Sequence, residues 1–115
     1  MNKSQLNLIL QEVKQALQKL YRNQLEAIIL YGSQAREDAQ EFSDIDILVV
    51  LKSEINPYHE IDRTSQVISN ICLNNDVVIS RHFISSAKFE NENTPFNYNV
   101  KKEGIFLWYR RSKNL

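Results

Sequence analysis

The sequence lacks the features of a disulfide-stabilised, membrane-spanning or secreted protein. Cys72 is the only cysteine among 115 residues, so no intrachain disulfide and no cysteine-based metal site can form. No apolar run approaches the roughly 20 residues that a membrane-spanning helix needs. Polar residues interrupt the apolar ones near the N-terminus, which excludes a secretory signal pattern there. These absences favour a cytoplasmic protein that folds without disulfides.

Excess charge of either sign is also missing. The formal net charge is +0, so no global field attracts the chain to nucleic acid or to a membrane surface. Direct nucleic-acid binding is therefore not expected. A basic cluster near the C-terminus is interpreted as a solvated face, with binding of nucleic acid or an acidic partner as the alternative. It consists of Lys101, Lys102, Arg110, Arg111 and Lys113.

What is present is an ordinary globular composition. Hydrophobic residues make up 43% of the chain and charged residues 24%, which argues against disorder. The length suits one domain covering residues 1–115, and it suffices for a hydrophobic core. Internal repeats and low-complexity segments are absent from the sequence.

Hydrophobic periodicity alternates between helix and strand along the chain. The predicted helices cover residues 4–22, 33–39, 57–73 and 95–103, with a further helical turn at 85–89. The predicted strands cover residues 25–31, 45–51, 76–83 and 105–109. This order, α-β-α-β-α-β-α-β, predicts an α/β (α+β) fold in which a small mixed β-sheet is flanked by helices.

Two aspartates stand at the head of the second predicted strand. Asp44 and Asp46 are two residues apart, so both side chains project from the same face of the strand. Adjacent carboxylates repel each other, and a bound cation relieves the repulsion. Their hard oxygen ligands favour Mg²⁺ or Mn²⁺. A pair of such ions could clamp the entering and leaving oxygens of a displacement at phosphorus.

The end of the first predicted strand supplies a turn suited to phosphate. Gly32 has no Cβ, so a phosphate could approach its backbone closely. A helix that starts at Ser33 would direct free N–H groups toward an anion, and the Ser33 hydroxyl could contact a phosphate or the metal. Arg36 could pair with a phosphate. Asp76, at the head of the third predicted strand, would complete the site as a metal ligand or a general base.

Simpler interpretations compete with each of these assignments. A lone Asp-x-Asp often marks only a solvated strand start, Asp76 could be a turn residue, and Arg36 could be a surface arginine. His82 is interpreted as a structural strand residue. Tyr31 and Phe42 flank the motif, and core packing is favoured over stacking on a base. The aromatic residues of 105–109 belong either to the core or to a protein interface.

The motif resembles that of a known superfamily. Gly32-Ser33-x-x-Arg36, followed by Ser43 to Val50, is similar to the GS…DxD signature of the nucleotidyltransferases that include DNA polymerase β. The short chain looks most like the minimal nucleotidyltransferases, or MNT proteins. This resemblance implies ATP-dependent nucleotidyl transfer with two Mg²⁺ ions. It assigns Asp44, Asp46 and Asp76 to catalysis and metal binding, and it assigns Gly32, Ser33 and Arg36 to the nucleotide.

The same resemblance implies a partner. Many MNT proteins are antitoxins encoded with a HEPN-domain ribonuclease toxin, and some transfer AMP to that toxin. We therefore expect an adenylyltransferase that modifies a protein hydroxyl, since so short a chain has little room for an acceptor domain. Gln34 and Glu37 depart from the family pattern and reduce the local positive charge. A non-catalytic antitoxin acting by stoichiometric contact, or a small-molecule transferase of the aminoglycoside type, is the alternative, and homo-oligomerisation is left open.

Overall fold

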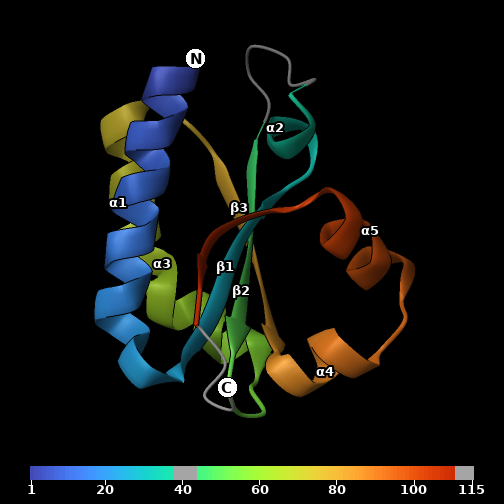
Figure 1. Cartoon of the computed structure of the whole chain (residues 1–115). Coiled ribbons are helices and arrows are strands. Elements are labelled where there is room, and N and C mark those ends of the chain that lie inside the picture. The colour runs from blue at the N-terminus through green and yellow to red at the C-terminus, as the bar shows by residue number, and fades with distance from the viewer. Residues whose placement is uncertain (38–43, 111–115) are drawn as a thin grey trace.

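A computed structural model describes residues 1–37 and 44–110 of the chain (Figure 1). The predicted alternation of helices and strands is confirmed within these residues. The elements are α1 (Lys3–Tyr21), a 3₁₀ turn (Arg22–Gln24), β1 (Leu25–Tyr31), α2 (Ser33–Arg36), β2 (Ile45–Leu51), α3 (Pro57–Asn75), β3 (Ile79–Ser85), α4 (Ser86–Asn91), α5 (Pro95–Glu103) and β4 (Ile105–Tyr109). The end of the predicted helix 33–39 lies outside the described residues.

The strands form one mixed four-stranded sheet in the order β3-β2-β1-β4. β1 pairs antiparallel with both β2 and β4, whereas β2 and β3 are parallel and are connected through α3. Figure 1 shows α1 and α3 on one face of the sheet and α4 and α5 on the other. The expected α/β fold with a small mixed sheet flanked by helices is therefore confirmed.

Alternation along the strands divides the core between these two faces. The larger cluster packs under α1 and α3 and includes Val13, Leu17, Ile28 and Ile47. The smaller cluster, under α4 and α5, includes Ile29, Leu48, Val50, Phe89 and Val100. Residues Ile28, Ile29 and Leu48 are completely buried, so β1 and β2 are central strands with apolar side chains on both faces.

Side chains at the helix starts explain where the helices begin. Asn2 accepts a hydrogen bond from the backbone N–H of Gln5, and the Gln5 side chain accepts one from the N–H of Asn2, forming a capping box. Asn56 and Thr94 cap α3 and α5, and each is followed by a proline in the first turn. These helices start within one residue of the predicted positions 4, 57 and 95.

The predicted third strand is wrong at both ends. It was expected over 76–83, but β3 runs from Ile79 to Ser85. Asp76 instead ends α3: it adopts the left-handed conformation (φ 53°, ψ 50°), and its N–H donates to the carbonyl of Cys72. The helix continues to Asn75, two residues beyond its predicted end, so the chain enters the sheet three residues later than predicted.

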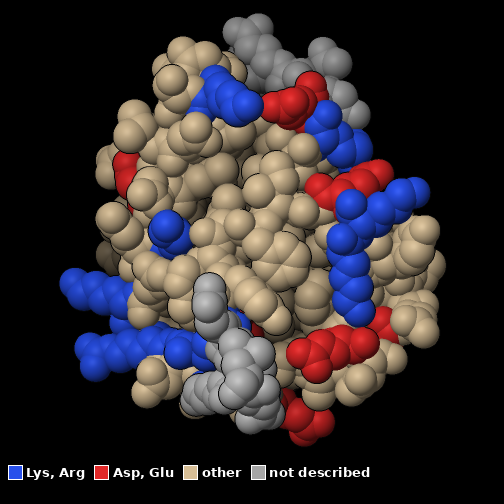
Figure 2. Space-filling model, viewed as in Figure 1, with Lys and Arg blue, Asp and Glu red and all other residues tan. Residues whose placement is uncertain are grey.

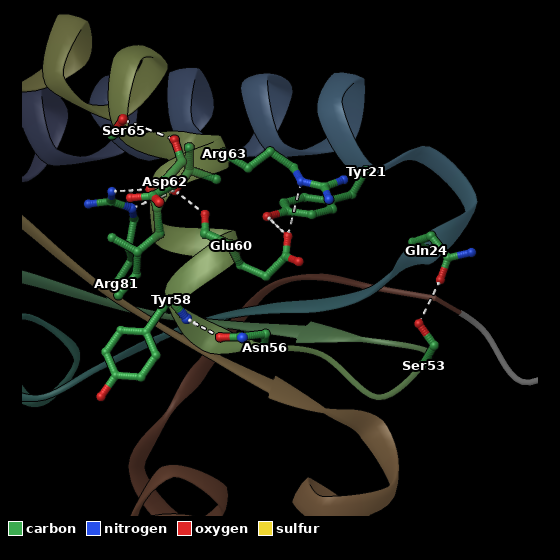
Figure 3. A network of polar contacts seen from close by, with 12 residues as sticks. Tyr21, Gln24, Ser53, Asn56, Tyr58, Glu60, Asp62, Arg63, Ser65 and Arg81 are labelled. Carbon is green, nitrogen blue, oxygen red and sulfur yellow. Dashed lines mark hydrogen bonds and ion pairs between the residues drawn. The ribbon is translucent and has the colours of Figure 1, made fainter.

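A buried acidic side chain ties the end of α1 to the start of α3 (Figure 3). The hydroxyl of Tyr21 donates to Glu60 Oε1 at 2.8 Å, and Arg63 Nε lies 3.4 Å from the same oxygen. Glu60 is only 7% exposed, so these partners offset the loss of its hydration. Burial and the neighbouring Glu60 raise the pKa of Tyr21, which keeps its hydroxyl protonated as the donor.

The basic residues near the C-terminus contact their own neighbours. Lys101 lies over the ring of Phe89 and Lys102 over that of Tyr98, while Arg110 donates to the carbonyl of Leu25. On the face in Figure 2, the blue side chains lie at separate places around a largely uncharged centre. Arg111 and Lys113 lie outside the described residues. No helix in the described part of the chain is long and apolar enough to cross a bilayer.

The aromatic run 105–109 is divided between packed and exposed side chains. Trp108 packs against the larger core cluster. Phe106 and Tyr109 are exposed, and their rings meet edge to face with centroids 5.4 Å apart. They line a cavity of about 460 Å³ together with Ala27, Val50 and Phe89.

Candidate functional site

The turn after β1 lies directly against the aspartate pair at the head of β2. Gly32 has φ 74° and ψ −157°, a conformation that is open essentially to glycine alone. A Cβ at this position would lie 2.4 Å from Oδ2 of Asp46. Glycine is therefore required both by the backbone and by the space, and its absence of a side chain lets the turn and the carboxylate meet.

Asp44 and Asp46 project from β2 beside this turn. Asp46 is opposite Tyr31 in β1 and opposite Ser80 in β3, so it lies at the centre of three strands. Ser80 Oγ is 3.3 Å from Oδ2 of Asp44. Burial and then the negative charge of Asp44 raise the pKa of Asp46, while the positive charges of His82 and Arg36 oppose the shift.

This electrostatic arrangement fits a divalent cation. The proximity of Asp44 raises the free energy of the ionised Asp46, and a bound cation would lower it. Within residues 1–37 and 44–110, no three His, Cys, Asp or Glu side chains gather as a metal-binding group. Mg²⁺ commonly takes only one or two protein carboxylates and completes its shell with water and substrate phosphate. The pair Asp44 and Asp46 is therefore a sufficient protein donor set for a metal that arrives with a nucleotide.

Asp76 does not join this pair in the described structure. It lies in the turn that ends α3, two residues before Val78, whose carbonyl accepts the N–H of Ile45. The strand residue level with Asp46 is Ser80. The sequence argument placed Asp76 beside the pair because it assumed that β3 starts at this residue, and the longer α3 removes that premise.

The residues after Gly32 form a single helical turn, Ser33–Arg36. The N–H groups of Ala35 and Arg36 donate back to the carbonyl of Gly32. Arg36 Nη1 lies 3.4 Å from Glu103 Oε2 at the end of α5, and both side chains are partly exposed. Glu37 has φ 62°, which a glycine would adopt with less strain, and its carboxylate pairs with Lys3 at 3.2 Å.

An aromatic cluster forms the wall next to Asp46. The hydroxyl of Tyr31 and Nδ1 of His82 are 2.7 Å apart, although these residues come from β1 and β3 with β2 between them. Phe96 of α5 meets Tyr31 edge to face at a centroid distance of 5.3 Å and lies 5.8 Å from the His82 ring. Burial and then the negative charge of Asp46 raise the pKa of Tyr31 to about 12.

Sequence reasoning missed most of this wall. It interpreted Tyr31 as core and His82 as structural, and it gave no role to Ser80, Phe96 or Glu103. The alternation of side chains along a strand could have identified Ser80 and His82. Once β3 is placed correctly, both lie on the same face of the sheet as Asp46. Phe42, the other aromatic candidate, lies outside the described residues.

The chain is similar in sequence to known proteins. The family described as "Polymerase beta, Nucleotidyltransferase" matches residues 11–113 of the chain. A proposed protein adenylyltransferase of Methanocaldococcus jannaschii is 36% identical over 100 residues, which cover 86% of this chain and 94% of that protein.

Two solved structures share the fold. A chain of a toxin–antitoxin complex with AMP-PNP superposes with a TM-score of 0.62 at 18% identity, covering 89% of this chain and 74% of the other. The second structure is the complex of the tri-AMPylated Shewanella oneidensis HEPN toxin with MNT antitoxin. One of its chains gives a TM-score of 0.58 at 17% identity, covering 90% of this chain and 72% of the other. The match over residues 11–113 and the curated relative place this chain in the polymerase beta nucleotidyltransferase family, as a nucleotidyltransferase enzyme.

Proposed function

We propose that the chain transfers AMP from ATP to a hydroxyl group of a HEPN-domain toxin and thereby acts as its antitoxin. The observation that carries the proposal is the contact between the Gly32 turn and the Asp44–Asp46 pair. The curated relative is named for adenylyl transfer to protein, and the structural neighbours include a HEPN toxin with its MNT antitoxin. A cytoplasmic location, where ATP is abundant, is part of the proposal.

Each residue of the site has a role in this reaction. Asp44 and Asp46 would hold divalent metal, Mg²⁺ or Mn²⁺, which supplies charge neutralisation at the phosphates when bound. The turn at Gly32 and Ser33 would receive the β- and γ-phosphates, and Arg36 would exchange its contact with Glu103 for a phosphate oxygen. Asp76, from its position in the structure, is given no role.

The bonds that change follow from the reaction class. The acceptor oxygen forms a bond to the α-phosphorus of ATP, the bond from that phosphorus to the bridging oxygen breaks, and pyrophosphate leaves. The acceptor proton passes to solvent, to which Asp44 is exposed. Phosphoryl transfer of this kind depends mainly on positioning and on charge stabilisation, which the aspartates and the turn provide.

Incubation of the chain with labelled ATP, Mg²⁺ and a HEPN-domain protein from the same genome tests the proposal. We expect label on the HEPN protein with wild type, and a loss of at least about 100-fold with Asp44→Asn or Asp46→Asn, since each removes a metal ligand. Asp62→Asn, which changes an exposed aspartate of α3, is the matched control and should behave as wild type. Equal labelling by wild type and Asp46→Asn would overturn the proposal.

A non-catalytic antitoxin is the second candidate. Two observations favour it: Arg36 already pairs with Glu103, and Asp76 does not join the other carboxylates. The two candidates differ in the double variant Asp44→Asn, Asp46→Asn. If that variant neutralises the HEPN protein fully at equal abundance, stoichiometric contact is the mechanism.

A further inference from the structure

The third strand brings a second set of side chains to the face that carries the aspartates. Ser80 is level with Asp46, and His82 follows two residues later on the same face. His82 is exposed, and its Nδ1 is engaged by the hydroxyl of Tyr31. The opposite ring nitrogen, Nε2, is therefore the one that can be directed toward a ligand.

The order of the strands places the Gly32 turn and His82 on opposite sides of the aspartates. The Gly32 turn follows β1, the aspartates belong to β2, and His82 belongs to β3 on the other side of β2. In an in-line displacement the entering and leaving oxygens are on opposite sides of the phosphorus. If pyrophosphate leaves toward the turn after β1, the acceptor enters from the side of β3.

Helix α5 crosses the site between these two sides. Its first turn carries Phe96, which contacts the rings of His82 and Tyr31, and its last residue, Glu103, reaches Arg36. Phe96 is 38% exposed, so part of its ring remains open next to His82. The side of β3 thus offers an open aromatic surface beside a ring nitrogen.

We propose that His82 and Phe96 form the acceptor-binding surface and determine which hydroxyl is modified. This inference rests on the proposed adenylyl transfer and adds the recognition of the acceptor. His82 Nε2 hydrogen-bonds the acceptor segment, and the open part of the Phe96 ring packs against an apolar or planar group next to the hydroxyl. Tyr31 is a positioning residue, because its hydroxyl fixes the orientation of the His82 ring.

The chemistry of the surface selects the class of acceptor. Beside the His82 ring nitrogen, this surface presents the partly exposed ring of Phe96, which packs against uncharged groups. The acceptor that fits is a protein segment whose hydroxyl is flanked by an uncharged, apolar side chain.

Kinetic variants separate acceptor recognition from nucleotide binding. His82→Asn retains a hydrogen-bonding atom for Tyr31 but removes Nε2, and Phe96→Ala removes the ring. With a HEPN-domain protein from the same genome as acceptor, we expect the acceptor KM to rise at least about tenfold in each variant. The Kd of Mg²⁺ with α,β-methylene ATP, measured by calorimetry, should stay within about twofold of wild type. Tyr98→Ala, on the outward side of α5 and 63% exposed, is the matched control.

A crosslinking experiment tests the same surface without depending on transfer. p-Benzoylphenylalanine at position 96 should crosslink to the HEPN-domain protein in the presence of Mg²⁺ and α,β-methylene ATP, and the same group at position 98 should not. If wild type transfers no AMP but position 96 crosslinks selectively, the proposed reaction fails and the surface assignment stands. The inference is overturned if position 96 does not crosslink, or if His82→Asn and Phe96→Ala weaken the nucleotide instead of the acceptor.

Discussion

Replacement of Gly32 by alanine tests the contact on which the site is built. The backbone of Gly32, at φ 74° and ψ −157°, is in a region that costs other residues about 1–3 kcal/mol. The new Cβ would also lie 2.4 Å from Oδ2 and 3.3 Å from Cγ of Asp46. The carboxylate must move to relieve this overlap, so both stability and metal-dependent nucleotide binding should fall.

The magnitude follows from the size of the chain. An unfolding entropy of about 2.1 cal/mol/K per residue gives about 0.24 kcal/mol/K for 115 residues. The backbone strain alone should therefore lower Tm by about 4–12 °C in differential scanning calorimetry. We expect the affinity for Mg²⁺ with α,β-methylene ATP, measured by titration calorimetry, to fall at least about tenfold because Asp46 is displaced.

Gly104→Ala is the matched control. A Cβ there would meet the Val100 carbonyl oxygen at 2.5 Å and Ile29 Cγ2 at 2.6 Å, with an ordinary φ of −70°. This variant should lose stability and keep its nucleotide affinity. If Gly32→Ala has the Tm and affinity of wild type, or if both variants lose nucleotide affinity equally, the reasoning about the Gly32 turn is refuted.

Three further predictions concern residues outside that turn or the charge within it. Tyr21→Phe should destabilise the chain by about 1–3 kcal/mol in urea unfolding, because Glu60 loses a buried donor, whereas Tyr58→Phe at a site 79% exposed should change nothing. Asp76→Gly should stabilise the chain by about 0.5–1 kcal/mol, because glycine adopts the left-handed conformation without strain. Transfer activity should be unchanged, and a loss of activity would show that Asp76 belongs to the site. Burial and Asp44 raise the pKa of Asp46, so the folded chain binds this proton more tightly than the unfolded chain does, and metal-free stability falls as pH rises through the raised pKa. Asp46→Asn should therefore raise Tm at neutral pH and abolish transfer, and the gain in Tm should vanish on acidification; a gain that persists at low pH would contradict this account.

Much of the fold was predictable because its signals are local. The helix starts at Asn56 and Thr94 depend on a capping side chain followed by proline, and these groups lie within a few residues of each other. The central strands were predictable because apolar residues on both faces occur in short runs. The start of β3 was not, because Asn74 and Asn75 suit a turn but are also tolerated in the last turn of α3.

The candidate site also has a part that local sequence signals predict and a part that they do not. Gly32, Asp44 and Asp46 lie within one short stretch. The spacing of the aspartates predicts that they share a face, and the structure places Gly32 beside Asp46. His82 and Phe96 are brought to the site by the register of β3 and by the position of α5. That information depends on tertiary packing, which no pattern in a window of neighbouring residues contains.

The hydrogen bond between Tyr31 and His82 has a consequence for the outer edge of the sheet. β3 is an edge strand of the described sheet, and within residues 1–37 and 44–110 its backbone pairs with β2 alone. The side-chain bond passes over β2 and attaches β3 to β1 as well. Edge strands usually open first in local unfolding, which amide hydrogen exchange detects. Near the candidate site, β3 is therefore held both by its backbone pairing with β2 and by the His82 side chain, so opening of β3 there requires the disruption of both contacts.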